Sequence, residues 1–159
     1  IASPTAIVHI KAGTATASTA PLKFNSGPLL AVTEAGSVEF LTDNIYFTQT
    51  TSTTRQAVAF WSKKALTLGI GVTTFSALNN SVIVLTGDAA ANVVATITGG
   101  IAGQHVTLQF VDALVTITDN DTHTANTTSL AGNFVSTAND TLTLEFDGTS
   151  WYEVARSIN

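Results

Sequence analysis

The run TLTLEFDGTSWYEVA at residues 141–155 constrains the fold of this chain more than any other stretch. Apolar and polar residues alternate from 141 to 146, which is the pattern of a β-strand with one buried face. Asp147 and Gly148 follow directly, and Asp-Gly supplies the positive φ angles that a tight or bulged hairpin needs. A second alternating run begins shortly afterwards, so the stretch predicts an antiparallel hairpin.

Shorter runs of the same kind recur through the rest of the chain and predict further strands. Turn residues such as Gly, Pro, Asn and Asp separate them. Residues 55–68 could form a strand or a strand that leads into a short helix, and the sequence pattern does not decide between the two. No window keeps the spacing of a long helix. We therefore expect an all-β fold. The runs lie at residues 7–11, 21–24, 37–41, 44–48, 81–85, 92–98, 105–110, 113–117, 129–130 and 133–135.

These runs divide the chain into a short-strand, fibre-like module at 1–60, a junction at 61–80 and a carboxy-terminal antiparallel β domain at 81–159. Residues 12–20 contain no side chain larger than Thr. Ordering a residue costs about 1.5 kcal/mol and burial returns about 25 cal/mol per Å², so each residue would need roughly 60 Å² of buried apolar surface. Small side chains do not reach that area. We expect this segment to pack against other chains or to act as a tether.

Charged residues make up only 11% of the chain, against roughly 25% in an ordinary domain. Part of such a surface is expected to meet other copies of the chain. The net charge of −5 and the scattered Lys and Arg residues argue against binding to nucleic acid or to an anionic membrane. No apolar run reaches the roughly 20 residues of a membrane span. The chain has neither Cys nor Met, which excludes disulfides and leads us to expect a piece processed or excised from a longer protein.

Two stretches resemble sequences of bacteriophage tail fibres and related virion proteins. The first begins PTAIVHIKAGTATASTAPLKFNSGPLL, continues through EAGSVEF, DNIYFTQTTSTTR and AVAF, and is similar to a module of tail-fibre and tail-collar-like proteins. The second comprises GQHVTLQF, VTITD, LAGNF and NDTLTLEFDGTSWYEVARS, and is similar to the carboxy-terminal end of tail fibres and tailspikes. Together the two stretches cover most of the chain, and residues 61–102 match less well.

The resemblance implies an elongated, intertwined homotrimer of the triple β-helix or β-prism kind, at the host-facing end of a virion fibre and thus outside the cell. It implies attachment to a host-surface polysaccharide or protein and contact with other virion tail proteins. We expect neither enzymatic activity nor a cofactor. Two alternatives remain, a fragment of a tailspike carbohydrate-active enzyme and a bacterial surface adhesin. The 159 residues are too few for these modules together with a polysaccharide-degrading β-helix, which argues against the first alternative.

The run DNDTH at residues 119–123 is the one cluster in the sequence with the character of a metal site. A calcium loop of this type needs Gly at its sixth position and Glu at its twelfth. Thr124 and Leu130 stand at those positions, so the calcium motif is not met. Asp and Asn favour turns because their side chains bond the neighbouring backbone. We therefore expect a polar turn here and no metal site.

Catalytic candidates are few. His9, His105 and His123 are the only histidines, and no Ser lies in a GxSxG nucleophile motif. His9 and His105 lie in alternating runs, which favours the role of an ordinary strand residue over that of a general base. On a threefold axis either His could meet its copies in the other chains and bind an ion. Glu145 and Glu153 belong to the two strands of the predicted hairpin, and we expect both on its solvent face, where no pocket brings them together for glycoside hydrolysis.

Receptor contacts are expected in loops and at exposed rings. Trp151 and Tyr152 are neighbours in one strand, so one ring should be buried and the other exposed, where it could stack on a sugar. The polar loops at 49–54 and 119–128 are the candidate binding loops. The sequence does not identify the receptor or the residues that contact it.

Overall fold

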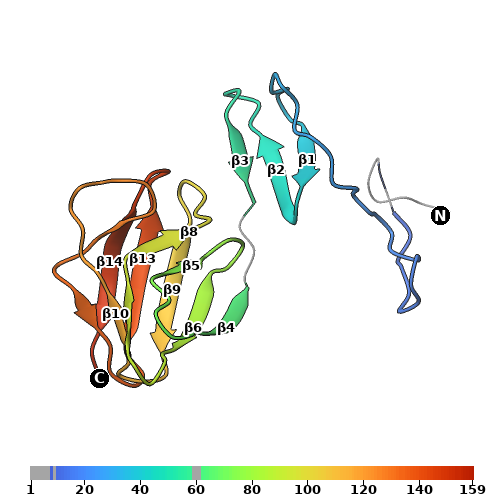
Figure 1. Ribbon diagram of the computed structural model, residues 1–159. Helices are drawn as coiled ribbons and strands as arrows, with labels where there is room; N and C mark the ends of the chain where they lie inside the picture. The colour runs from blue at the N-terminus through green and yellow to red at the C-terminus, as the bar shows by residue number, and fades with distance from the viewer. Residues whose placement is uncertain (1–7, 9, 59–61) are drawn as a thin grey trace. The chain divides into compact units, whose positions relative to one another are not determined.

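The computed structural model of the protein describes residue 8, residues 10–58 and residues 62–159. The chain forms two compact units, the first at Ile1–Val58 and the second at Ala59–Asn159 (Figure 1). Every regular element among the described residues is a strand and none is a helix, so the predicted all-β class is confirmed. In the same residues we find no helix able to span a membrane.

The first unit contains a three-stranded antiparallel sheet in the order β1-β2-β3, formed by β1 (Val38–Leu41), β2 (Asn44–Thr48) and β3 (Arg55–Ala57). The turn between β1 and β2 has two residues with positive φ, Thr42 at 40° and Asp43 at 63°. Positive φ at both central positions is the geometry of the two-residue turns that match the twist of a hairpin. The strands predicted at 37–41 and 44–48 are therefore present.

The chain before this sheet has no strand among its described residues. The run predicted at 21–24 is not a strand, since no second strand lies beside it to pair with its backbone. Of the run predicted at 7–11, residues 7 and 9 lie outside the described residues, and the other three are not in a strand. Several hydrogen bonds tie the segment to the sheet: the amide of Gly27 donates to the carbonyl oxygen of Phe40 at 3.1 Å, and the amide of Thr42 donates to the Ser26 hydroxyl at 3.0 Å.

The second unit contains three sheets. A six-stranded sheet has the order β11-β14-β13-β9-β6-β4, a three-stranded sheet the order β12-β10-β7, and β5 pairs with β8. The strands are β4 (Lys63–Thr67), β5 (Thr74–Ser76), β6 (Val82–Thr86), β7 (Asn92–Val94), β8 (Thr96–Thr98), β9 (His105–Phe110), β10 (Val115–Ile117), β11 (Thr128–Ser129), β12 (Phe134–Val135), β13 (Thr141–Phe146) and β14 (Trp151–Ser157).

Successive turns of the chain stack on one another in a β-solenoid-like arrangement. β4, β6 and β9 pair in parallel, as do β5 with β8 and β7 with β10. The antiparallel domain expected at 81–159 is therefore a mixed structure. Parallel neighbours need a long crossover connection, and here β7 and β8 lie in the connection between β6 and β9. Antiparallel pairing is found where β13 joins β9 and β14.

The stretch expected as a junction at 61–80 contributes to the second unit wherever the structure describes it. It contains β4 and β5, and Leu68, Phe75 and Ala77 are part of the hydrophobic core. Residues 55–68 contain β3 and β4 and no helix among the described positions. The chain therefore divides at 58/59, close to the end of the expected first module.

The hairpin predicted at 141–155 is present as β13 and β14, and it closes the core of the second unit. Trp151 is fully buried and Tyr152 is 36% exposed, as expected for neighbours in one strand. The indole Nε1 of Trp151 donates to the carbonyl oxygen of Ile97 at 2.7 Å, and its ring lies 4.8 Å from that of Phe146. This bond fixes β14, which belongs to the six-stranded sheet, to β8, which lies across the core from that sheet.

Candidate functional site

A row of polar side chains crosses the outer face of the six-stranded sheet at one end. Tyr152 of β14 pairs with Ser129 of β11 on one side and with Glu145 of β13 on the other, and Glu145 pairs with His105 of β9. Paired residues of adjacent strands present their side chains on the same face. His105 Nε2 lies 3.6 Å from Glu145 Oε2, and both side chains are about half exposed. We call these four residues the polar row.

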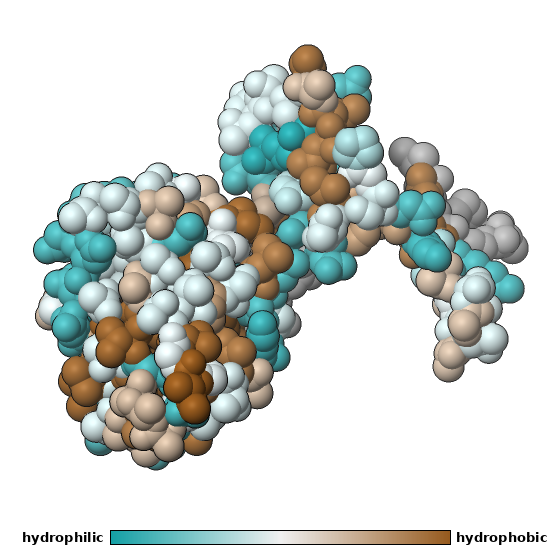
Figure 2. Space-filling view, viewed as in Figure 1, coloured by the Kyte–Doolittle hydropathy of each residue, from teal (hydrophilic) through white to brown (hydrophobic). Residues whose placement is uncertain are grey.

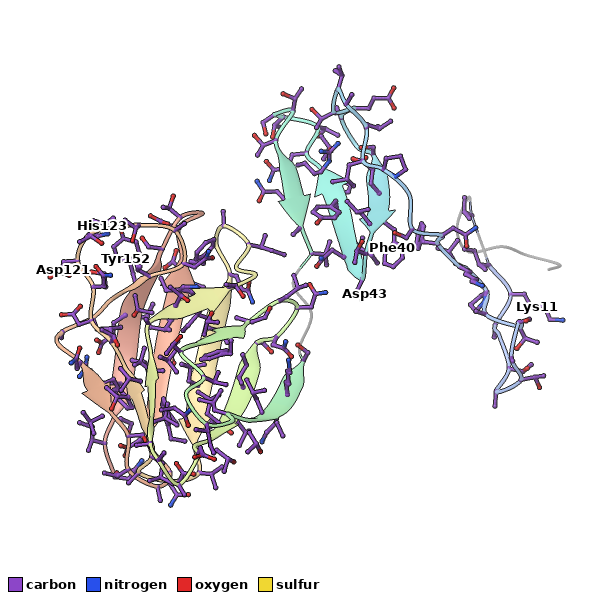
Figure 3. The ribbon with its side chains drawn as sticks, viewed as in Figure 1. Lys11, Phe40, Asp43, Asp121, His123 and Tyr152 are labelled. Carbon is purple, nitrogen blue, oxygen red and sulfur yellow. The ribbon has the colours of Figure 1, made fainter. Side chains whose placement is uncertain are left out.

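His123 reaches the polar row from the loop before β11. Its Nδ1 lies 3.1 Å from the Tyr152 hydroxyl, and the two rings stack with centroids 5.4 Å apart and an angle of 26° between their planes. Its backbone φ of 49° is unusual for a residue other than Gly. Asp121, His123 and Tyr152 gather at one end of the second unit (Figure 3). The structure thus joins two features that the sequence indicated only separately, the loop at 119–128 and an exposed ring.

Asp147, in the turn of the hairpin, adds a fixed negative charge close to this cluster. Its carboxylate accepts the amides of Thr149 at 2.7 Å and Ser150 at 2.8 Å. Hydrogen bonds from the Ser150 and Thr149 amides, with smaller contributions from the Tyr152 hydroxyl and His123, hold the pKa of the Asp147 carboxyl below its usual value. The carboxylate remains ionised at neutral pH and lies beside a ring pair that can donate and accept hydrogen bonds.

The acidic residues of the loop at 119–128 are bonded to the two residues that directly follow the loop. Asp119 Oδ1 accepts the amide of Leu130 at 2.8 Å, and Asp121 Oδ1 accepts the Ser129 hydroxyl at 3.1 Å. Asn120 Oδ1 accepts the amide and the hydroxyl of Thr122. Across the described ranges 10–58 and 62–159, no three His, Cys, Asp or Glu side chains are grouped so that they could hold a metal ion. These residues form the polar turn that the sequence predicts.

The expected placement of Glu145 and Glu153 on one solvent face is wrong. Glu145 pairs with Tyr152 and therefore faces outward, whereas Glu153 pairs with Leu144, a core residue, on the opposite face. Glu153 is bonded to Arg156 and accepts the amide of Ala131 at 2.9 Å. The Arg156 hydrogen bonds are the main cause that lowers the pKa of the Glu153 carboxyl. Tyr152 and Glu153 are adjacent in β14 and therefore lie on opposite faces. Since Glu145 shares the face of Tyr152, the two carboxylates do not converge.

The remaining sequence candidates lie apart from the polar row. His9 lies outside the described residues. The loop at 49–54 belongs to the first unit, between β2 and β3, and the Thr33 hydroxyl donates to the carbonyl oxygen of Thr53 in it at 2.7 Å. A shallow depression lies at the other end of the outer face that carries the polar row, and is lined by Val84, Gln109, Phe110, Val111, Asn139 and Thr141.

A second surface with a possible role is the sheet of the first unit. No apolar side chain is buried among the described residues of that unit, where only Asn44 and Thr48 are buried. All described members of the hydrophobic core lie between Leu68 and Trp151, in the second unit. Hydrophobic side chains gather near β1 and β2 in the space-filling view (Figure 2). The first unit therefore has exposed apolar side chains and no hydrophobic core among its described residues that could bury them.

Comparison with known families finds no matching family model, and comparison with curated proteins finds no match to the chain.

Proposed function

We propose that this chain is a structural and receptor-binding part of a bacteriophage tail fibre that attaches the virion to its host as a homotrimer. The observation that carries the proposal is the contrast between the two units. The second unit encloses its own core, and the first unit has an extended segment and a small sheet with no buried apolar side chain among its described residues. A three-stranded sheet of this size is marginal without further packing.

Assembly is the role that this contrast assigns to the first unit. Intertwining of three copies, in the manner of a triple β-helix or β-prism, pairs the backbone of the extended segment and covers its apolar side chains. Closed symmetry also avoids the open-ended growth that an uncovered sheet invites. The threefold symmetry comes from the tail-fibre resemblance, and the need for partner chains comes from the uncovered surface.

Attachment is the role that we assign to the second unit. Its polar row and the stacked rings of His123 and Tyr152 present two hydroxyls, two imidazoles and a carboxylate on an open face. Such a surface suits shallow contact with a host polysaccharide or a polar protein surface better than enclosure of a small molecule. Three copies on one rigid particle gain affinity by avidity, so each site can be weak.

We propose a non-enzymatic role at the virion surface, outside the host cell and in contact with other tail proteins. The tailspike enzyme alternative needs two carboxylates that converge on one bond. Glu145 and Glu153 lie on opposite faces of their hairpin, so this pair does not favour it. The adhesin alternative shares the same geometry and differs only in the particle that carries the chain.

The proposal predicts that the purified chain has three times the 16.5 kDa mass of one copy in static light scattering and binds intact cells of its host saturably without releasing sugar. Tyr152→Ala should weaken binding by roughly tenfold or more, because the loss is repeated in each arm of a multivalent particle. Val154→Ala, an exposed neighbour in β14, is the matched control and should bind like the original chain. Sugar release, or no saturable binding to any strain of a broad panel, contradicts the proposal.

A further inference from the structure

We infer that copies of this chain join through one face of the β1-β2-β3 sheet, which carries Val38, Phe40, Ile45, Phe47 and Val58. This inference rests on the proposed homotrimer and assigns its contact surface. The register defines the face. Val38 pairs with Phe47 and Phe40 with Ile45, and the amide of Val58 donates to the carbonyl oxygen of Ile45 at 2.8 Å. Paired residues share a face, so these five side chains form one apolar layer, the joining face.

The joining face is uncovered in a single copy. Val38 is 51% exposed and Phe47 is 42% exposed, although both lie in paired strands. Phe24, from the segment before the sheet, packs beside Phe40 with ring centroids 6.4 Å apart and extends the apolar surface. Its ring is itself partly exposed. Apolar side chains grouped in this way, and not scattered singly, mark a surface that another molecule covers.

The opposite face of the same sheet is already satisfied within the chain. Glu39 pairs with Arg55 at 2.8 Å across the sheet, and both side chains are largely buried. The amide of Leu30 donates to Glu39 at 2.6 Å, and Arg55 Nη2 donates to the Leu30 carbonyl oxygen at 2.8 Å. These bonds, that of the Leu30 amide first, hold the pKa of the Glu39 carboxyl below its usual value. The segment around Leu30 closes this side, so the joining face is the one left open.

The chemistry of the joining face fits a second copy of itself. The five residues are uncharged, and Gln56, which pairs with Phe47, is the polar side chain that the register adds to them. Identical charged faces would repel each other or bury unpaired charge, and this face does neither. It also offers no charge by which a different, charged partner would be selected.

The size of the face indicates how copies are arranged. A fully buried aromatic side chain covers about 150–250 Å², so the exposed parts of this face amount to roughly 300 Å² per copy. A stable interface needs about 800 Å² per partner. The face therefore supplies the dry centre of a contact, and the extended segment at 10–33, with exposed Ile10, Leu22 and Val32, supplies the surrounding area by wrapping the neighbouring copies.

The test is the double variant Val38→Thr with Phe47→Thr in the full chain, followed by light scattering. Thr has the β-branched shape that strands favour, and it makes the face polar. The matched control is Val93→Thr with Val135→Thr, in β7 and β12 of the second unit, where the side chains are 56% and 63% exposed. We expect the first variant to dissociate at a concentration at least tenfold higher than the original chain, or to run at the 16.5 kDa of one copy, and the control to keep the original mass. An unchanged thermal transition of the second unit confirms that this unit is folded in both variants, and an unchanged far-ultraviolet circular dichroism spectrum confirms that the strands of the first unit are retained.

A second measurement uses the absence of Cys from the chain. Phe47→Cys introduces a single thiol on the joining face, and Val93→Cys introduces one on the second unit. A short bis-maleimide at micromolar protein should link the copies of the first variant within one particle and leave the second unlinked. If the original chain is a multimer that binds cells, yet the double Thr variant keeps its mass and Phe47→Cys does not cross-link, the joining face is overturned and the proposed function stands. An original chain with the mass of one copy overturns both the inference and the homotrimer.

Discussion

Gly100 shows how tightly single residues are fitted around the closing hairpin. A Cβ atom at this position would lie 2.6 Å from Cγ of Phe146 and 2.8 Å from Cζ2 of Trp151. Both rings are held in place, Phe146 within β13 and Trp151 by its bond to Ile97. The two rings have no free end that could move aside, so the position requires the smallest residue.

We therefore expect Gly100→Ala to lower the free energy of unfolding of the second unit by about 1–3 kcal/mol, the usual cost of overpacking a core. Gly69→Ala is the control, because its Cβ would meet only Cγ2 of Val72 at an ordinary 3.9 Å and its φ is not positive. Urea denaturation followed by Trp fluorescence measures both. Equal stability of the two variants would show that the aromatic pair can shift.

At the scale of elements, the strands that the sequence predicts best are those with one face in the core. β9 and β13 alternate strictly between buried and more exposed positions, and their limits match the predicted runs. β4 lies in the stretch 55–68, where strand and helix were left open, because it is at the edge of its sheet and mostly exposed, whereas β5 was missed because it has only three residues. Parallel pairing was missed because it joins segments that are far apart in sequence and leaves no local signal.

The turn that leads from β12 into β13 depends on Asp140. Its Oδ2 accepts the amide of Thr137 at 2.6 Å and its Oδ1 accepts the amide of Asn159 at 2.8 Å. These bonds, that of Asn159 first, lower the pKa of Asp140 below its ordinary value of 3.8. A lowered pKa means that protonation favours the unfolded chain. The stabilisation is therefore present above about pH 4 and is lost as the pH falls through the folded-state pKa.

Asp140→Asn should lower the melting temperature at pH 7, because an Asn side chain turns an NH₂ group toward one of the two amides that the carboxylate accepts. The difference in melting temperature between pH 7 and pH 3 should also become smaller than in the original chain. Asp88→Asn is the control for charge, since Asn can still accept the one amide, that of Ala90, which Asp88 Oδ1 accepts. Circular dichroism melts at both pH values test this. An unchanged pH dependence in Asp140→Asn would contradict the role given to the carboxylate.

At the scale of the whole molecule, the candidate surfaces were only partly readable from the sequence. The loop at 119–128 and an exposed ring at either Trp151 or Tyr152 were both indicated, but the contact of His123 with Tyr152 joins residues 29 positions apart. Glu153 was misplaced because its role depends on Arg156 and on the pairing of its strand. The small side chains of residues 12–20 predicted a segment that needs other chains or acts as a tether. The core of the second unit could not be read from the local pattern, since it forms only when distant strands stack.

The division into units predicts that a chain beginning at Ala59 folds by itself. All described core residues lie in this part, so the shortened chain should unfold cooperatively within a few degrees of the second unit in the full chain. It should also have the mass of one copy in light scattering, because it lacks the joining face. A shortened chain that is unfolded, or that still assembles like the full chain, contradicts the division of roles between the units.

The position of β14 between β11 and β13 determines when the second unit can be completed during synthesis. Of the strands of the second unit, β14 is synthesised last, yet it occupies an inner place in its sheet and carries Trp151, which is fully buried in the core. Until Trp151 has emerged, the core lacks its largest fully buried side chain. Translation therefore releases the first unit early, with its apolar side chains uncovered, while the second unit is still incomplete. Nascent chains on one messenger RNA could in this way meet through their first units before any of them has finished folding.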